Sequence, residues 1–156
     1  MTRFHRHSRH ERDSETVRQA SAIIQLFKYG VVGALNTILT LVVIFLCKSM
    51  LGMNPYVANA IGYVAGVINS FIWNRAWVFK AGDGSISRQA VKFLVGFAVC
   101  YLLQFGVVWV LNQSTFGDIR LDLAGFVLSG YGIATIIGMA VYTLSNFLFN
   151  RVVTFK

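Results

Sequence analysis

Residues 68–80 read INSFIWNRAWVFK, and residues 144–156 read LSNFLFNRVVTFK. In both segments a long apolar stretch ends in Asn-Arg, and Phe-Lys follows a few residues later. Polar groups that border membrane spans are costly, so a matched polar ending is unexpected by chance. The pair therefore indicates a membrane protein built from two copies of a helical hairpin.

The composition is that of a membrane protein. Apolar residues make up 56% of the 156 residues, charged residues only 13%, and the mean hydropathy is +0.61. Four stretches are long enough to cross a bilayer, namely 26–47, 55–73, 93–111 and 123–149. The fourth exceeds the required length of ~20 residues, so we expect it to tilt or to begin near Gly130. We predict an all-α membrane protein with four transmembrane helices in one domain over residues 25–156.

The positions of Lys and Arg predict which side of the membrane each connection faces. Of the 14 basic residues, all but Lys48 and Arg120 lie before the first stretch or at its start, between the second and third, or after the fourth. Lys and Arg are enriched in cytoplasmic loops. Both termini are therefore predicted to be cytoplasmic, and both hairpins enter the membrane from the same side.

Residues 1–24 form a basic, polar segment. They lack the apolar core and the cleavage site of a secretory signal, so we expect a disordered cytoplasmic tail that contacts anionic lipid headgroups. Its histidines, His5, His7 and His10, are predicted to be solvated, because no other metal-ligand set lies nearby in the sequence. No nucleic-acid partner is expected, since aromatic residues do not interleave with the basic ones.

The internal repeat extends beyond the two quoted segments. Shifting residues 54–80 by 76 positions gives eight identities with residues 130–156, which include Asn74 with Asn150 and Arg75 with Arg151. The first and third stretches match at a shift of 64, which places an insertion in the second hairpin. We predict two parallel-oriented hairpin repeats. They cover residues 25–80 and 89–156.

Small residues recur at four-residue intervals on the second and fourth stretches. This spacing places them on one helix face, where they let helix backbones approach closely. We expect these ladders to pack helices together rather than to line a substrate path. Their members are Ala58, Gly62, Gly66 and Ser70 on the second stretch and Gly130, Ala134 and Gly138 on the fourth.

Amide side chains within the apolar stretches need hydrogen-bond partners, and an inter-helix bond there contributes about 1 kcal/mol. For Asn36 and Asn69 two interpretations stay open, an inter-helix hydrogen bond and a contact to substrate. For Asn59 the inter-helix bond is favoured. Asp and Glu are absent from all four stretches, which argues against a proton-coupled exporter and against acid–base hydrolysis. We expect neither an enzyme nor a metal or cofactor site.

Arg75 and Arg151 are predicted at the cytoplasmic ends of their helices, where a guanidinium binds phosphate through two parallel hydrogen bonds. Lys28 and Lys92 open the other two helices on the same side. The four cations would form a ring that suits an anionic lipid headgroup. For the lysines, anchoring at the membrane surface is the favoured interpretation. For the arginines a function is favoured, because Asn precedes each of them and the pair recurs.

Three motifs resemble the GtrA-like family of small four-span bacterial membrane proteins. They are KYGVVGALNT at 28–37, NRAWVF at 74–79 and NRVVTF at 150–155. The resemblance covers all but the tail. The family pattern has an aromatic residue two positions after Asn-Arg, which Trp77 satisfies and Val153 does not.

That family is linked to the synthesis of cell-surface polysaccharides such as O-antigen. The resemblance implies a protein of the bacterial inner membrane that flips a polyprenyl-phosphate-linked monosaccharide, such as undecaprenyl-phosphate glucose, to the outer leaflet. We expect the arginines to capture the phosphate, the amides to bind sugar hydroxyls and Trp77 to stack on the sugar or the isoprenoid. The candidate substrate-binding residues are Arg75, Arg151, Asn74, Asn150, Asn36, Asn69, Asn146, Lys28, Lys92, Gln104 and Trp77.

Two other functions stay open. The chain could be a non-transporting scaffold that recruits a membrane glycosyltransferase, which the resemblance also allows. It could be a small multidrug-type exporter, although the lack of an intramembrane acid weighs against this. Four spans form a thin wall around a sugar phosphate, so we expect a homo-oligomer.

Overall fold

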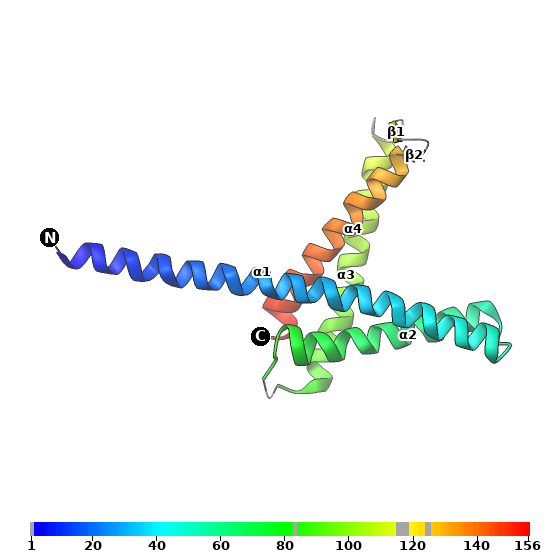
Figure 1. The fold of residues 1–156 in the computed structure, drawn as a ribbon, viewed down its shortest axis with the longest axis horizontal. Coiled ribbons are helices and arrows are strands. Elements are labelled where there is room, and N and C mark those ends of the chain that lie inside the picture. Colours follow the sequence, from blue (N-terminus) through cyan, green and yellow to red (C-terminus); the bar gives the residue numbers. More distant parts are fainter. Residues whose placement is uncertain (1, 83, 115–118, 124–125) are drawn as a thin grey trace. The chain divides into compact units, whose positions relative to one another are not determined.

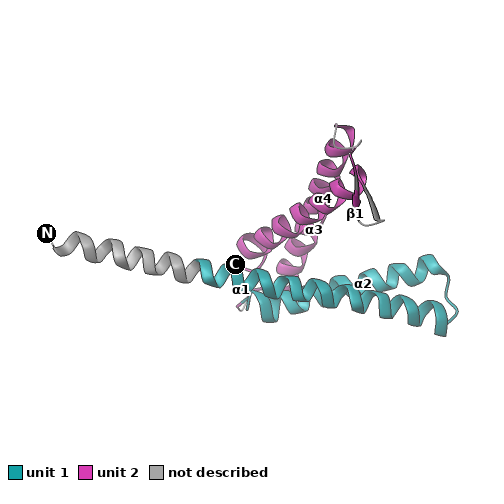
Figure 2. Cartoon of the chain, turned by 45° about the horizontal axis from the view of Figure 1, so that its top comes forward, with its two compact units in different colours: residues 1–81 teal, residues 82–156 magenta. Residues whose placement is uncertain are grey.

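The chain folds into two compact units, Met1–Ala81 and Gly82–Lys156, which Figure 2 colours separately. The computed structural model describes residues 2–82, 84–114, 119–123 and 126–156, with side chains described from residue 19 onwards except at 121, 123 and 126–128. Each unit is a helical hairpin and is described by itself.

Unit 1 consists of α1 (Thr2–Phe45), the π-helix η1 (Leu46–Met50), α2 (Pro55–Trp73) and the π-helix η2 (Asn74–Val78). Figure 1 shows α1 and α2 lying side by side. The first helix includes residues 19–24, which the sequence assigned to the tail; these carry Ala and Ile and extend the apolar stretch. The predicted disorder of the rest of the tail stays a prediction.

The turn of unit 1 follows from its local sequence. Gly52 has a φ of 62°, a conformation that a side chain would strain. The Asn54 side chain then accepts a hydrogen bond from the backbone N–H of Tyr56 at 2.9 Å, and Pro55 occupies the first helical position. An Asn cap followed by Pro is a strong helix start, because it satisfies one free N–H and needs none at the next position.

The small-residue ladder of α2 faces α1. Ala58, Gly62 and Gly66 are buried, and a Cβ on Gly62 would lie 2.6 Å from Ile44 Cγ1 and 3.0 Å from the Thr40 carbonyl oxygen. Helix backbones this close leave no room for a larger residue. The prediction that the ladder serves helix packing is confirmed for unit 1.

Unit 2 consists of α3, two strands, α4 and a π-helix. The bounds are α3 (Ile86–Gln113), β1 (Arg120–Leu123), β2 (Phe126–Ser129), α4 (Gly130–Phe149) and η4 (Asn150–Thr154). The strands pair antiparallel, with Arg120 opposite Ser129 and Leu123 opposite Phe126.

The all-α prediction is therefore wrong in one place. Short runs of Leu, Val and Phe between polar residues suit paired strands as well as a helix, and they form a β-hairpin before α4. The fourth helix begins at Gly130, as expected, because the Ser129 side chain caps it by accepting from the Gly132 N–H at 3.2 Å.

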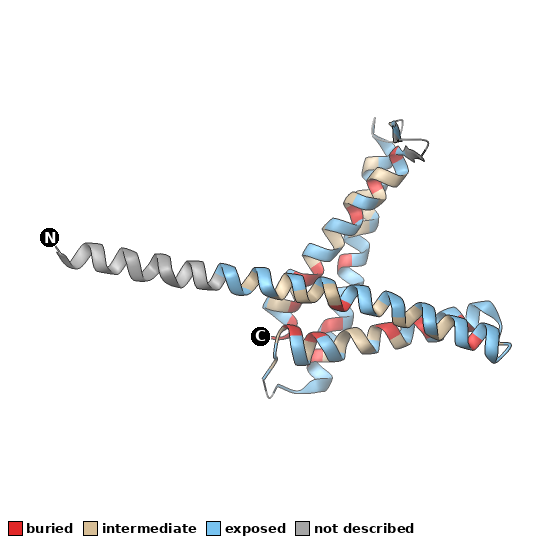
Figure 3. Cartoon of the chain, viewed as in Figure 1, coloured by how far each residue is buried: buried red, intermediate tan, exposed pale blue. Residues whose placement is uncertain are grey.

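The ladder of α4 packs on α3 in the same manner. Gly130, Ala134 and Gly138 are buried, and a Cβ on Gly138 would lie 2.5 Å from Val108 Cγ2 and 3.2 Å from Gln104 Cγ. Nearer the C-terminus the glycine lies on α3 and the larger residue on α4, since the Phe149 ring packs against Gly96. Figure 3 shows the buried residues gathered along the seam between the two helices of each unit.

Among the residues that the structure describes, four helical segments are long and apolar enough to cross a membrane. They are Gln19–Met50, Pro55–Val78, Ile86–Gln113 and Gly130–Thr154. Large apolar side chains cover their exposed surfaces, for example Phe27, Leu41 and Leu102. Such surfaces are compatible with lipid and not with water.

Candidate functional site

Each Asn-Arg motif begins a π-helix. Asn74–Val78 extends α2, and Asn150–Thr154 extends α4. In unit 1 the backbone N–H of Phe79 donates to the Asn74 carbonyl oxygen at 2.9 Å. In unit 2 the backbone N–H of Phe155 donates to the Asn150 carbonyl oxygen, also at 2.9 Å. Both π-turns form the C-terminal ends of their helices, where such turns are found, and α1 ends in the same way with η1.

The asparagine of each motif is buried in the protein. Asn74 is 1% exposed and Asn150 is 0% exposed. Each amide nitrogen donates to the side chain four residues earlier, from Asn74 Nδ2 to Ser70 Oγ at 3.1 Å and from Asn150 Nδ2 to Asn146 Oδ1 at 3.2 Å. The Oδ1 atoms of both asparagines have no hydrogen-bond partner among the described residues.

The arginines that follow are half-buried at the last turn of their hairpins. Within each unit, the lysine of the first helix reaches the π-helix of the second. The Lys28 ammonium lies 5.2 Å from the centre of the Trp77 ring, a cation–π distance. Lys92 Nζ donates to the Val153 carbonyl oxygen at 3.1 Å. Lys28 and Arg75 therefore lie at the same end of unit 1, and Lys92 and Arg151 lie at the same end of unit 2.

An aromatic pair closes the same end of each unit. Tyr29 contacts Phe79 with ring centroids 6.2 Å apart, and Phe93 contacts Phe155 at 6.3 Å. Both distances suit tilted aromatic packing. These pairs hold the first helix of each unit, near its lysine, against the residue that follows the π-helix.

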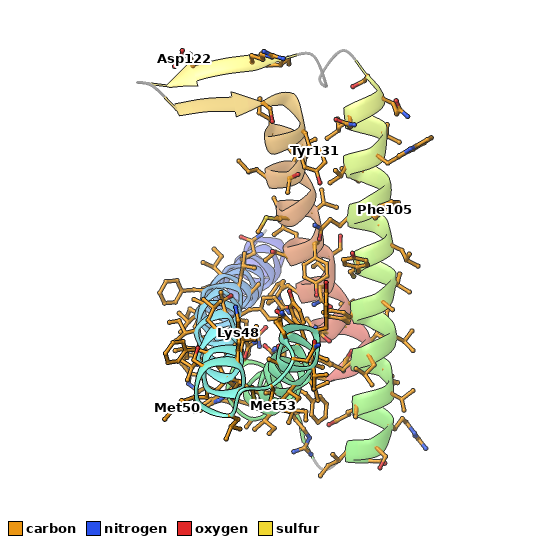
Figure 4. The ribbon with its side chains drawn as sticks, turned by 90° about the vertical axis from the view of Figure 1, so that its right-hand side faces the viewer. Lys48, Met50, Met53, Phe105, Asp122 and Tyr131 are labelled. Carbon is orange, nitrogen blue, oxygen red and sulfur yellow. The ribbon has the colours of Figure 1, made fainter. Side chains whose placement is uncertain are left out.

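The opposite end of unit 1 carries a single described cation, Lys48, in η1. Figure 4 shows it beside the turn that contains Met50 and Met53. In unit 2, the same view shows Asp122 on β1, beyond Tyr131 at the start of α4. The paired cations of each hairpin thus lie at the Asn-Arg end and not at the turn.

The remaining amides have separate roles. Asn69 Nδ2 donates to Asn36 Oδ1 at 2.6 Å, which confirms the inter-helix interpretation for this pair. The expected inter-helix bond of Asn59 is wrong: its amide donates to the Pro55 carbonyl of its own helix at 2.8 Å, because the residue faces outward. Gln104 packs against Gly138.

The structure adds three residues that the sequence analysis had not singled out, Tyr142, Thr154 and Gln25. Asn146 Nδ2 donates to the Tyr142 hydroxyl at 3.3 Å, and Thr154, which is 1% exposed, has a hydroxyl without a partner among the described residues. Gln25 Oε1 is likewise buried and without a described partner. The signal for Tyr142 and Thr154 was their four-residue spacing from Asn146 and Asn150.

The structure groups the candidates within each hairpin. Unit 1 brings Lys28 to Trp77 and Asn36 to Asn69, and unit 2 brings Lys92 to Val153. The four-cation ring takes two residues from each unit and stays a prediction.

Comparison with known proteins agrees with this description. The model of the GtrA/DPMS transmembrane domain matches residues 28–155. An uncharacterized membrane protein of Bacillus subtilis (strain 168), YngA, is 30% identical over 87 residues, which cover 51% of this chain and 58% of YngA. The cell wall teichoic acid glycosylation protein GtcA of Listeria innocua serovar 6a is 25% identical over 141 residues, 86% of each chain. The chain is therefore a multi-pass membrane protein that belongs to the GtrA/DPMS transmembrane-domain family.

Proposed function

We propose that this protein flips a polyprenyl-phosphate-linked monosaccharide, such as undecaprenyl-phosphate glucose, from the cytoplasmic to the outer leaflet of the bacterial inner membrane. The sugar would then serve to glycosylate a cell-surface polysaccharide. Membership of the GtrA/DPMS family supports a role in cell-surface glycosylation, as does the name of the relative GtcA.

One observation carries the proposal: each hairpin places an arginine on a π-turn, with a lysine from the neighbouring helix at the same end. Cations within a bilayer protein are costly unless they serve anchoring or a substrate. Arg75 and Arg151 present planar guanidinium groups that can hold a phosphodiester through two parallel hydrogen bonds.

The lysines act beside the arginines. Lys28 rests on the face of Trp77, so its charge is partly balanced by the ring. Lys92 is bonded to a backbone carbonyl. Both ammonium groups attract an anionic headgroup to the membrane surface, while the arginines make the specific contact. The Trp77 ring would stack on the sugar or the isoprenoid once Lys28 moves to the phosphate.

The headgroup must cross ~30 Å of hydrocarbon, while the polyprenyl tail remains in lipid. The driving force in this proposal is the concentration gradient between synthesis inside and consumption outside. The two hairpins act as parallel-oriented repeats with both termini cytoplasmic, and a homo-oligomer would complete the wall around the headgroup.

Reconstitution tests the proposal. Purified protein in liposomes is expected to speed the transbilayer movement of fluorescently labelled polyprenyl-phosphate glucose. Arg75→Ala and Arg151→Ala each remove a charge-assisted contact worth ~1.5–3 kcal/mol, so each should slow movement about 10- to 100-fold. Lys48→Ala is the matched control, because it removes an exposed cation at the opposite end of hairpin 1.

Normal flipping by both folded arginine variants would overturn the phosphate assignment. Wild-type protein that produces no flipping, yet co-purifies with a membrane glycosyltransferase, would replace the transport proposal with the scaffold function. Circular dichroism and gel filtration of every variant establish that it is folded.

A further inference from the structure

A polar stripe, half-buried at Tyr142 and buried from Asn146 onwards, runs along one face of unit 2. Tyr142, Asn146, Asn150 and Thr154 lie four residues apart, on the face that continues the ladder of Gly130, Ala134 and Gly138. Hydrogen bonds connect the first three, from Asn150 to Asn146 and from Asn146 to Tyr142. A stripe of four polar residues spans about 18 Å of helix at 1.5 Å per residue.

The stripe ends in two buried oxygen atoms without described partners, Asn150 Oδ1 and Thr154 Oγ1. Asn150 is 0% exposed and Thr154 is 1% exposed. More than nine in ten buried polar groups in proteins have a hydrogen-bond partner, and those that lack one call for a water, an ion or a ligand. Two such atoms one helical turn apart indicate a binding site for a hydrogen-bonding group rather than a single packing defect.

The chemistry of the two oxygens restricts the occupant. An amide oxygen accepts hydrogen bonds and cannot donate them, so its partner must be a donor. A phosphodiester has no donor at neutral pH and therefore cannot satisfy Asn150 Oδ1. A hydroxyl group donates to the amide oxygen and can also pair with the Thr154 hydroxyl.

We infer that Asn150 and Thr154 form a hydroxyl-binding site that reads the sugar of the transported lipid, and that this site belongs to hairpin 2. The inference rests on the proposed function and deepens it. Asn150 binds a sugar hydroxyl, while the adjacent Arg151 binds the phosphate. The two halves of one motif thus recognise two different parts of the same headgroup.

Hairpin 1 shows why the site is specific to hairpin 2. The 76-residue shift relates Thr154 to Val78, which is also buried, at 2% exposure. It relates Asn146 to Ser70 and Tyr142 to Gly66. Unit 1 therefore keeps a buried asparagine, Asn74, whose Oδ1 also has no described partner, but it lacks the second oxygen four residues later on the same helix. The two hairpins differ in the residues that can contact a sugar.

The experiment compares two ligands that share charge and tail. Calorimetric titration of detergent-solubilised protein uses a short-chain polyprenyl-phosphate glucose and the corresponding methyl polyprenyl phosphate, a phosphodiester without sugar. Wild-type protein should bind the glucose lipid more tightly than the methyl lipid. A single neutral hydrogen bond is worth ~0.5–1.5 kcal/mol, so Thr154→Val should reduce this preference about 3- to 10-fold. Its affinity for the methyl lipid should not change.

Three variants accompany Thr154→Val. Thr154→Ser keeps the hydroxyl and should keep the preference. Thr143→Val removes an exposed threonine hydroxyl of α4 and serves as the matched control. Asn150→Ala should reduce the preference further, although loss of its bond to Asn146 can also disturb folding. Thr154→Val is safer, because hairpin 1 already accommodates Val at the related position.

Each outcome decides the inference separately from the proposed function. An unchanged preference in Thr154→Val, with a raised melting temperature, would mean that only water occupied the site and would overturn the inference. Equal binding of the two ligands by wild-type protein would overturn it too. A preference that falls as expected, in a protein that does not flip lipid in liposomes, would sustain the sugar site and reject transport.

Discussion

At the residue scale, the two hairpins differ in how the lysine of the first helix contacts the segment that follows Asn-Arg. The residue two positions after Asn-Arg is Trp77 in one and Val153 in the other. Lys28 lies over the Trp77 ring, whereas Lys92 reaches the Val153 carbonyl oxygen. The departure from the aromatic pattern thus coincides with a different lysine contact at the related position. In the proposals above, Trp77 of hairpin 1 would offer an aromatic face to the sugar or lipid, and Asn150 and Thr154 of hairpin 2 would bind a sugar hydroxyl.

The Asn36–Asn69 bond provides a residue-scale prediction. Asn36→Ala and Asn69→Ala should each lower stability, and the double variant should be scarcely worse than either single variant. The expected coupling is about 1 kcal/mol, because inter-helix hydrogen bonds in membranes are worth about 0.6–1.7 kcal/mol. Unfolding in SDS measures the four free energies. Additive losses would mean that the amides act independently, despite the 2.6 Å contact.

At the element scale, the contact between helices depends on small residues in register. Gly62 and Gly66 let α2 approach α1 near Thr40, and Gly138 lets α4 approach α3 near Gln104. Hydrophobic attraction between helices is weak in lipid, so close packing supplies much of the association. The π-turns follow these close-packed segments in the chain, and they carry the polar and charged residues of the Asn-Arg motifs.

Gly62→Ala tests the seam of unit 1. The new Cβ would meet Ile44 and the Thr40 carbonyl, so overpacking should cost about 1–3 kcal/mol. Gly30→Ala is the matched control, because nothing lies within 4 Å of its Cβ position. That variant should be neutral or gain up to about 1 kcal/mol from helix propensity. Thermal melting in detergent measures both, and equal melting temperatures would contradict the packing role of Gly62.

At the scale of the whole molecule, the sidedness of the hairpins decides whether the cations face the pool of newly made lipid. The basic residues predict cytoplasmic termini, with Lys48 and Arg120 outside. The Asn-Arg ends would then receive the phosphate at the inner leaflet. The β-hairpin before α4 would face the outer side, where the sugar is consumed.

Labelling of single cysteines tests this sidedness. In a variant with Cys47 and Cys100 replaced by Ala, Lys48→Cys and Arg120→Cys should react with a membrane-impermeant maleimide in intact spheroplasts. Lys156→Cys should react only after permeabilisation. The expected difference in labelling is at least about tenfold, because the bias of Lys and Arg toward cytoplasmic loops sets one overall orientation. Reaction of Lys156→Cys from outside would reverse the proposed direction of capture.

The four helices, the small-residue ladders and the polar ends of both hairpins could be predicted from the residues alone. Bilayer thickness sets the helix length and the four-residue period sets the packing face, and both are local properties. The Asn-Arg motif also stood out as a site candidate, because a recurring polar pair beside an apolar stretch has few structural reasons to exist.

Only the tertiary structure decided the partners of the polar groups. Helix rotation and contact across the seam decide whether Asn36 bonds to Asn69 and whether Lys92 reaches the Val153 carbonyl. They also decide whether the Thr154 hydroxyl is buried without a described hydrogen-bond partner. The β-hairpin before α4 is another case, since strands form only when two segments pair. A sequence specifies which groups need partners, but the folded chain alone brings particular partners within hydrogen-bonding distance.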